Sequence, residues 1–132
     1  MTPQQVELVQ TSFKKVVPIA ATAADLFYDR LFEMAPETRA MFPADLTEQK
    51  RKLMSILGTA VSNLHKFDAI LPAVKDLGRR HKRYGVTTEH YAPAGAALLW
   101  TLEQGLGADF TPDVKAAWSA AYTALAGVMT AA

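Results

Sequence analysis

Hydrophobic residues recur at intervals of three and four along most of the chain, a spacing typical of amphipathic α-helices. The clearest stripe follows Thr111, where every interval is one, three or four residues and fits a period of 3.6. Signals for β-strands do not recur anywhere. We therefore predict an all-α fold. The C-terminal stripe consists of Val114, Ala117, Trp118, Ala121, Tyr122, Leu125, Val128 and Met129.

Capping residues and prolines divide the first third of this pattern into helices. The segment Thr2–Gln5 predicts a capping box with a proline at the first helical position. Pro18 interrupts the pattern, and a second helix is expected from about Ile19 to Met34. A short third helix is expected from Pro36 to Phe42, ended by Pro43.

The middle of the chain carries similar signals. Asp45–Glu48 is a second candidate capping box, and it would open a helix that runs to about Leu64. Asp68 is expected to cap the next helix. Gly78 is expected to interrupt that helix near its end, and Gly85 marks the loop that follows.

Two helices are expected in the last third. Thr87 or Thr88 would cap a long helix from Glu89 to about Leu106, with Gly107 as its C-terminal glycine. The segment Thr111–Asp113 opens the final helix. The pattern therefore predicts six or seven helices joined by short connections.

Composition narrows the class of protein. The 132 residues include 14 Lys and Arg against 13 Asp and Glu, so the net charge of +1 favours neither nucleic acid nor an anionic membrane as partner. Cysteine is absent, which excludes disulfides, thiolate catalysis and iron–sulfur clusters. No apolar run approaches the roughly 18 residues of a membrane helix, and no signal peptide is recognisable. We predict one cytoplasmic domain over residues 1–132.

His81 is the most informative candidate for chemistry. It lies in the basic run Leu77–Val86. Neutral imidazole is the commonest protein ligand for a metal and the usual axial ligand of haem iron. Taken alone, however, a histidine in a basic stretch is more often solvated than a ligand.

A second group of candidates lies upstream. Gln49, Leu53 and Leu57 share one helix face through their spacing of four residues. Such a stripe usually packs into the hydrophobic core, with its one polar residue at the boundary of the core. Ordinary packing also accounts for Tyr28 and Phe42 when each is taken alone.

Five motifs occur in a definite order along the chain, and together they change this interpretation. They resemble the globins, and more narrowly the single-domain bacterial haemoglobins related to the haem domain of flavohaemoglobins. The resemblance implies the globin fold, a three-over-three helical sandwich. The motifs are Leu26–Phe32, Arg51–Met54, Leu77–His81 with Tyr84–Val86, His90–Tyr91, and Ala117–Trp118.

The resemblance implies a role for each candidate. His81 would ligate the iron of haem b, Tyr28 and Gln49 would hydrogen-bond a ligand on the distal side, and Tyr91 would support the histidine. The guanidinium of Arg80 suits a haem propionate, although a solvated helix face is the simpler explanation of this basic cluster. The expected cofactor contacts are Phe42, Leu53, Leu57, Leu77, Arg80, His81 and Val86.

The activity implied by the resemblance is reversible binding of dioxygen with high affinity. Each hydrogen bond to the charge on a bound ligand contributes about 1.5–3 kcal/mol. Two such bonds would raise affinity by roughly two to three orders of magnitude. Oxidation of nitric oxide to nitrate is the implied enzymatic activity, and it would need a separate electron-donating reductase.

One feature departs from the flavohaemoglobin pattern. A glutamate late in the last helix completes a proximal network there, but its position would fall past Ala132, and nothing acidic follows Asp113. Such a network makes the histidine a stronger electron donor. The sequence therefore leaves open whether Tyr91 alone supports His81 in this way.

Two other functions are compatible with the sequence. One is a haem-based gas sensor or ligand store without turnover. The other is a haem-free helical interaction module, in which Gln49, Leu53 and His81 are ordinary core and surface residues. A monomer or weak homodimer is expected in each case, with neither nucleic acid nor membrane as partner.

Overall fold

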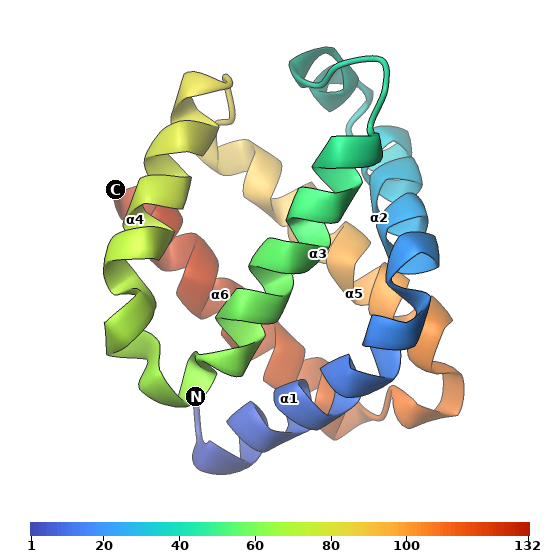
Figure 1. The fold of residues 1–132 in the computed structure, drawn as a ribbon, viewed down its shortest axis with the longest axis vertical. Coiled ribbons are helices and arrows are strands. Elements are labelled where there is room, and N and C mark those ends of the chain that lie inside the picture. Colours follow the sequence, from blue (N-terminus) through green and yellow to red (C-terminus); the bar gives the residue numbers. More distant parts are fainter.

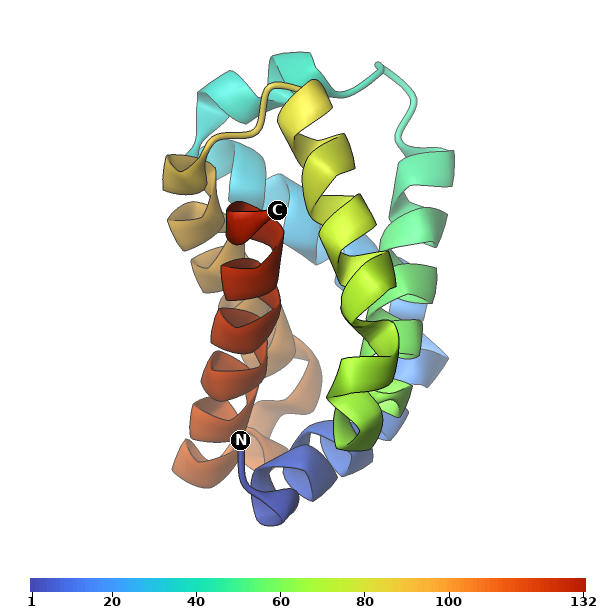
Figure 2. The same cartoon turned by 90° about the vertical axis from the view of Figure 1, so that its left-hand side faces the viewer.

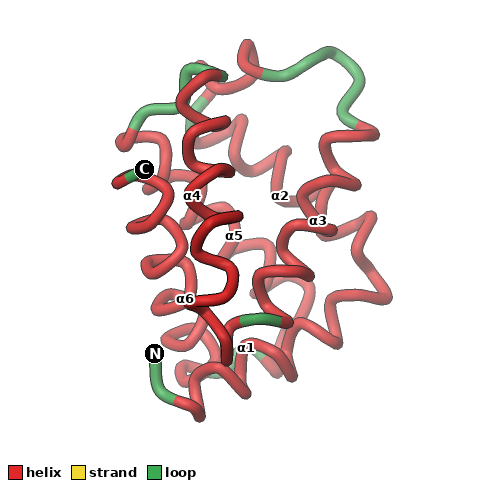
Figure 3. Tube along the Cα trace, turned by 60° about the vertical axis from the view of Figure 1, so that its left-hand side comes forward, coloured by secondary structure: helices red, strands yellow, loops and turns green.

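The computed structural model describes residues 1–132, and every regular element in it is helical (Figures 1 and 3). This confirms the predicted all-α class. None of the helices is both long and apolar enough to cross a membrane. The α-helices are α1 (Pro3–Val16), α2 (Ala20–Met34), α3 (Thr47–Ser62), α4 (Phe67–Arg83), α5 (Tyr91–Leu106) and α6 (Pro112–Ala131). The 3₁₀ turns are η1 (Val17–Ile19), η2 (Pro36–Met41), η3 (Leu64–Lys66), η4 (Thr88–His90) and η5 (Gly107–Asp109).

Several predicted helix ends are confirmed. The Gln5 backbone N–H donates to the Thr2 hydroxyl at 3.1 Å, and the Thr2 N–H donates to the Gln5 side chain at 3.0 Å. Thr111 caps α6 by accepting from the Val114 N–H at 3.2 Å. Gly107 follows α5 with a φ of +56°, a conformation that favours glycine.

Two predicted caps are wrong. Asp45 does not open a capping box, because α3 begins at Thr47 and the residue before it, Leu46, has no capping side chain. The Asp45 carboxylate instead accepts from the Thr47 N–H at 3.0 Å and the Thr47 hydroxyl at 2.7 Å. Asp68 lies inside α4, which begins at Phe67. Its negative charge near the N-terminus of α4 interacts favourably with the helix dipole, but its side chain does not cap the first turn.

The start of α5 also differs from the prediction. Thr87 does cap, but it caps the short turn η4, where its N–H donates to His90 Nδ1 at 3.0 Å. The α-helix itself begins at Tyr91 rather than at Glu89. The local capping residues therefore predicted where this turn lies, but they did not predict that it is a 3₁₀ turn.

The expected interruption at Gly78 is wrong as well. Helix α4 continues through this position to Arg83, and Gly78 is buried. A Cβ at Gly78 would lie 2.6 Å from the Met129 Cα and would collide with the Met129 carbonyl oxygen. The glycine therefore allows α4 to approach the α6 backbone closely, which only the tertiary structure reveals.

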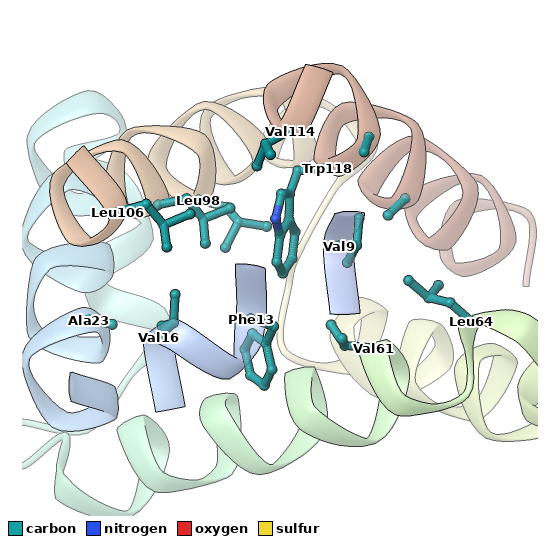
Figure 4. Close-up of a cluster of buried hydrophobic side chains, with 13 residues drawn as sticks. Val9, Phe13, Val16, Ala23, Val61, Leu64, Leu98, Leu106, Val114 and Trp118 are labelled. Carbon is teal, nitrogen blue, oxygen red and sulfur yellow. The ribbon is translucent and has the colours of Figure 1, made fainter. Parts of the chain in front are cut away.

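The helices are arranged so that one end of the molecule is tightly packed. α1 and α4 pack mainly on α6, and α2 packs mainly on α5. Figure 1 shows α3 and α4 in front of α5 and α6. The main core lies between the α3–α4 pair and the α5–α6 pair. In this core the rings of Phe13 and Trp118 have centroids 6.1 Å apart (Figure 4). The Trp118 indole N–H donates to the buried Ser12 hydroxyl at 2.9 Å, so the core polar groups are satisfied.

Candidate functional site

Helices α3 and α4 form a V that is closed at η3 and open at the other end (Figures 1 and 2). Gln49 lies near the beginning of α3 and His81 near the end of α4, so both lie toward the open end. The two helices make few direct contacts, since α3 packs mainly on α2 and α4 on α6. Neither helix therefore covers the other at the end that carries the candidate residues.

The apolar residues predicted to contact a cofactor are only half-buried. Leu53 packs around the buried Tyr28, whereas Leu57 packs against the main core. Partly exposed apolar side chains leave apolar surface that is available to another group. The residues of this kind are Phe42, Leu53, Leu57, Leu77 and Val86.

The structure brings the two predicted distal residues into contact. Tyr28 on α2 is 3% exposed, and the Gln49 amide Nε2 donates to its hydroxyl oxygen at 3.2 Å. A salt bridge of 2.7 Å between Lys50 and Asp25 joins the same two helices beside this pair. Because the Tyr28 oxygen accepts from Gln49, its own O–H hydrogen remains available to a ligand.

Aromatic rings hold Tyr28 in place. Phe27 packs edge-on at 5.1 Å between ring centroids, Phe42 edge-on at 5.5 Å and Phe32 at 5.9 Å. The segment that carries Phe42 is fixed by Arg39, whose guanidinium donates to the carbonyls of residues 42, 43 and 44. The phenol is therefore confined to one orientation by packing.

Burial raises the pKa of Tyr28 above its ordinary value, and the hydrogen bond from Gln49 offsets part of this effect. Removing the phenolate from water is costly, so the neutral form is favoured. Tyr28 therefore remains a hydrogen-bond donor throughout the neutral pH range.

The His81 ring is oriented by the backbone of its own helix. Its Nδ1 lies 2.8 Å from the Leu77 carbonyl oxygen. A carbonyl only accepts, so Nδ1 carries the hydrogen and Nε2 is left with a free lone pair. An orienting bond of this kind is usual for histidines that ligate metals.

Two predicted residues are not joined to His81. Tyr91 forms no hydrogen bond with the imidazole; its backbone carbonyl instead accepts from the Tyr122 hydroxyl at 2.6 Å. Arg80 is exposed, and its Nε lies 3.2 Å from the Asp76 carboxylate in an ion pair within α4. Their proposed roles toward a cofactor stay predictions.

Sequence reasoning missed several residues around Tyr28. Phe32 could have been found, because it follows Tyr28 by four residues and so shares its helix face. Arg39 gave no local signal, since its role depends on three carbonyls in a loop. Ala94 and Ala97 on α5 complete the surroundings of Tyr28 together with Leu31.

The chemistry of the donors indicates what kind of metal group fits. The structure has no cluster of three His, Cys, Asp or Glu side chains that could hold a metal ion. A single imidazole outside any such cluster suits a metal whose other ligands belong to a flat macrocycle. The residues present therefore fit haem.

Comparison with protein families gives a match to the globin family over residues 25–129. Among curated proteins, the flavohemoprotein of Bacillus subtilis (strain 168) is 32% identical over 126 residues. That match covers 92% of this chain but only 31% of the flavohemoprotein, so the chain spans about a third of that relative's length.

Other relatives are matched over most of their length. Neuroglobin of Dissostichus mawsoni is 27% identical, with 94% of this chain and 87% of that protein covered. A solved structure of an engineered carbene transferase, a putative nitric oxide dioxygenase from Rhodothermus marinus, is 27% identical with a TM-score of 0.89. It covers 99% of this chain and 92% of that one, which confirms the predicted fold class.

Proposed function

The chain belongs to the globin family, and on this basis we propose that it holds haem b through His81 and binds dioxygen reversibly and tightly. The observation that carries the proposal is the buried Tyr28 hydroxyl, which accepts from Gln49 and keeps its own hydrogen. Haem, when bound, supplies the iron that coordinates a diatomic ligand.

On the proximal side, His81 Nε2 would bind the metal. The hydrogen bond from Nδ1 to the Leu77 carbonyl supports this role, because it fixes both the tautomer and the orientation of the ring. The half-buried side chains of Phe42, Leu53 and Val86 would cover the faces and edge of the macrocycle. Arg80 would reach a propionate after leaving Asp76.

On the distal side, Tyr28 and Gln49 would stabilise negative charge on a ligand. Donors held in a fixed orientation and shielded from water stabilise charge more than water itself does. Tyr28 offers its O–H and Gln49 its second amide N–H, and each bond is expected to contribute about 1.5–3 kcal/mol. The pair is expected to slow the release of dioxygen.

We further propose that the protein supports conversion of nitric oxide to nitrate. Nitric oxide, dioxygen and one electron combine to give one nitrate ion, so each turnover consumes an electron, which we propose comes from a separate reductase. Support comes from the names of two matched proteins, a flavohemoprotein and a putative nitric oxide dioxygenase. A protein without turnover would instead act as a gas sensor or ligand store.

The haem assignment is tested by replacing His81 with alanine. We expect His81→Ala to lose the Soret band or to bind hemin at least tenfold more weakly, and added imidazole to restore binding by occupying the vacated site. The matched control is His65→Ala, which removes an exposed histidine. If His81→Ala retains hemin and its spectrum without imidazole, His81 is not the ligand.

The distal assignment is tested by Tyr28→Phe. The loss of one hydrogen bond worth about 1.5–3 kcal/mol should accelerate dioxygen release roughly 10- to 100-fold at unchanged haem content. Tyr84→Phe is the matched control, because Tyr84 is 63% exposed. Stopped-flow measurement of release gives the comparison, and an unchanged rate in Tyr28→Phe would contradict the proposed role.

A further inference from the structure

The second half of α4 carries a dense group of positive charges. Five of the nine residues from 75 to 83 are Lys or Arg. Only Arg80 pairs with an acidic side chain, that of Asp76 at 3.2 Å. Lys82 donates to a main-chain oxygen of Ala132 and pairs with no acidic side chain. The cations without an acidic side-chain partner are Lys75, Arg79, Lys82 and Arg83.

These four residues form a basic stripe on one side of the helix. Their spacings from Lys75 are four, seven and eight residues, which place them on one face of an α-helix. All four are exposed, whereas Val74 and Gly78 on the inner face are buried. His81 also lies on the inner face, so the basic stripe is on the outside of the helix that carries the proposed metal ligand.

A groove runs beside the basic stripe. Helices α4 and α6 lie side by side (Figure 2), and between them is a groove of about 560 Å³. Lys75 and Arg79 form one wall, and small or apolar α6 residues together with Ala132 form the rest. No acidic residue lines the groove. The α6 lining residues are Thr123, Ala124, Gly127, Val128 and Ala131.

The charge of α4 contrasts with that of the remaining chain. α4 holds five Lys or Arg and two Asp, for a net charge of +3, whereas the whole chain carries +1. The rest of the molecule is therefore at −2. A local positive region on a slightly negative molecule orients an approaching anionic partner toward one face.

We propose that the basic stripe and the α4–α6 groove form the docking surface for an acidic face of the electron-donating reductase. This inference rests on the proposed function, because turnover with nitric oxide consumes one electron per nitrate. A donor docked here would be separated from the His81 imidazole by about one helix diameter, ~10 Å. The cations without an acidic side-chain partner provide the charge complementarity.

Duplex nucleic acid fits this surface less well. Phosphates follow a duplex at short intervals, and a protein that binds one neutralises many of them with Lys and Arg. Here the cations are confined to one helix, and the remaining surface carries a net negative charge that would repel a longer polyanion. A compact acidic protein surface matches the size of the groove and the basic stripe better.

The experiment compares two charge-reversed variants of the haem-loaded protein. Lys75→Glu with Arg79→Glu alters the basic stripe. Lys14→Glu with Lys115→Glu makes the same change in net charge at exposed lysines elsewhere that have no acidic partner. The probe is an acidic bacterial flavodoxin. Binding of the oxidised flavodoxin is measured by thermophoresis. The flavodoxin is then photoreduced, and its reduction of the ferric protein is followed by stopped flow.

We expect Lys75→Glu with Arg79→Glu to weaken flavodoxin binding and slow reduction at least tenfold at low ionic strength, with the control close to the parent. The difference should disappear near 1 M salt, where the Debye length is ~3 Å. Reduction by neutral reduced riboflavin should be equal in all three proteins. Equal flavodoxin binding by both variants would overturn the proposal, as would tighter binding of a duplex DNA that displaces flavodoxin.

Failure of the docking surface is distinguishable from failure of the proposed function. The Soret band and the reduction by riboflavin report on the haem and its iron without any docked protein. A normal spectrum with equal flavodoxin rates in both variants refutes only the docking surface. A chain that takes up no hemin refutes the proposed function, and with it the docking proposal.

Discussion

The two ends of the molecule differ in how completely their apolar side chains are buried. At the end where α1, α5 and α6 meet, Val9, Phe13 and Trp118 are almost completely buried, and the indole N–H is paired with Ser12. At the open end of α3 and α4, apolar side chains are only half-buried. The Tyr28 hydroxyl there accepts from Gln49 and donates to no protein group, and His81 is bonded only through Nδ1.

This difference separates residues that stabilise the fold from residues available for chemistry. Complete burial with every polar group paired contributes to folding and leaves nothing for a ligand. Incomplete burial with unused donors stabilises less but is suited to a bound group. If this contrast holds, substitutions in the closed core should destabilise the protein more than substitutions at the open end.

The largest effect is expected in the closed core. Trp118→Ala removes a side chain that is 2% exposed and leaves a cavity, which typically costs about 3–5 kcal/mol of unfolding free energy. Urea denaturation followed by circular dichroism measures the loss. Leu53→Ala at the open end is the comparison, and it should cost clearly less because Leu53 is half-buried. Equal losses would contradict the distinction between the two ends.

An intermediate effect is expected where α4 joins α6. Gly78→Ala places a methyl group against the Met129 backbone, which cannot move as a flexible side chain could, and should cost about 1–3 kcal/mol. Gly127→Ala on α6 is the matched control. Its added methyl meets no atom within 4 Å, so reduced freedom of the unfolded chain should stabilise it by up to about 1 kcal/mol.

Gly78→Ala also tests how the two ends are coupled. Gly78 directly follows Leu77, whose carbonyl orients His81, so displacement of α4 should weaken hemin binding as well as the fold. Measured together, the denaturation midpoint and the hemin affinity should both fall in Gly78→Ala and stay near the parent in Gly127→Ala. Unchanged stability in Gly78→Ala would show that α4 need not approach α6 so closely.

The smallest effect concerns alkaline pH. Burial raises the pKa of Tyr28 and of Tyr122 above the ordinary value of about 10. Because each pKa is higher in the folded state than in the unfolded chain, the stability that the protonated tyrosine contributes is complete below pH ~10. That stability is lost as pH rises toward the pKa of the folded state. Stability should therefore fall above pH ~10, by at most about 1.4 kcal/mol per pH unit for each tyrosine.

The two tyrosines lie on different helices, Tyr28 on α2 and Tyr122 on α6, so phenylalanine variants separate their contributions. Urea denaturation between pH 8 and 11 should give a shallower alkaline slope in both Tyr28→Phe and Tyr122→Phe than in the parent. The slope rather than the absolute stability is compared, because Tyr122→Phe also loses the bond to the Tyr91 carbonyl. A parental slope in either variant would mean that its tyrosine is not shielded from water.

The candidate residues were singled out by the resemblance to globins rather than by local patterns. Taken alone, the spacing of Gln49 and Leu53 and the basic run around His81 indicate core packing and a solvated surface. The contact between Gln49 and Tyr28 spans 21 residues and depends on how α3 packs against α2. The support of the Phe42 segment by Arg39 and the Tyr122 bond to the Tyr91 carbonyl could not be predicted, because backbone carbonyls carry no residue-specific signal.

The sequence by itself determined the helical class and several helix ends, since periodicity and capping act over about four residues. Thr2, Thr111 and Gly107 were readable for that reason. The tertiary structure alone decided that Gly78 is a contact surface rather than a break, and that α3 and α4 diverge. Such features depend on side chains far apart in the chain, whose combined packing fixes where each helix lies.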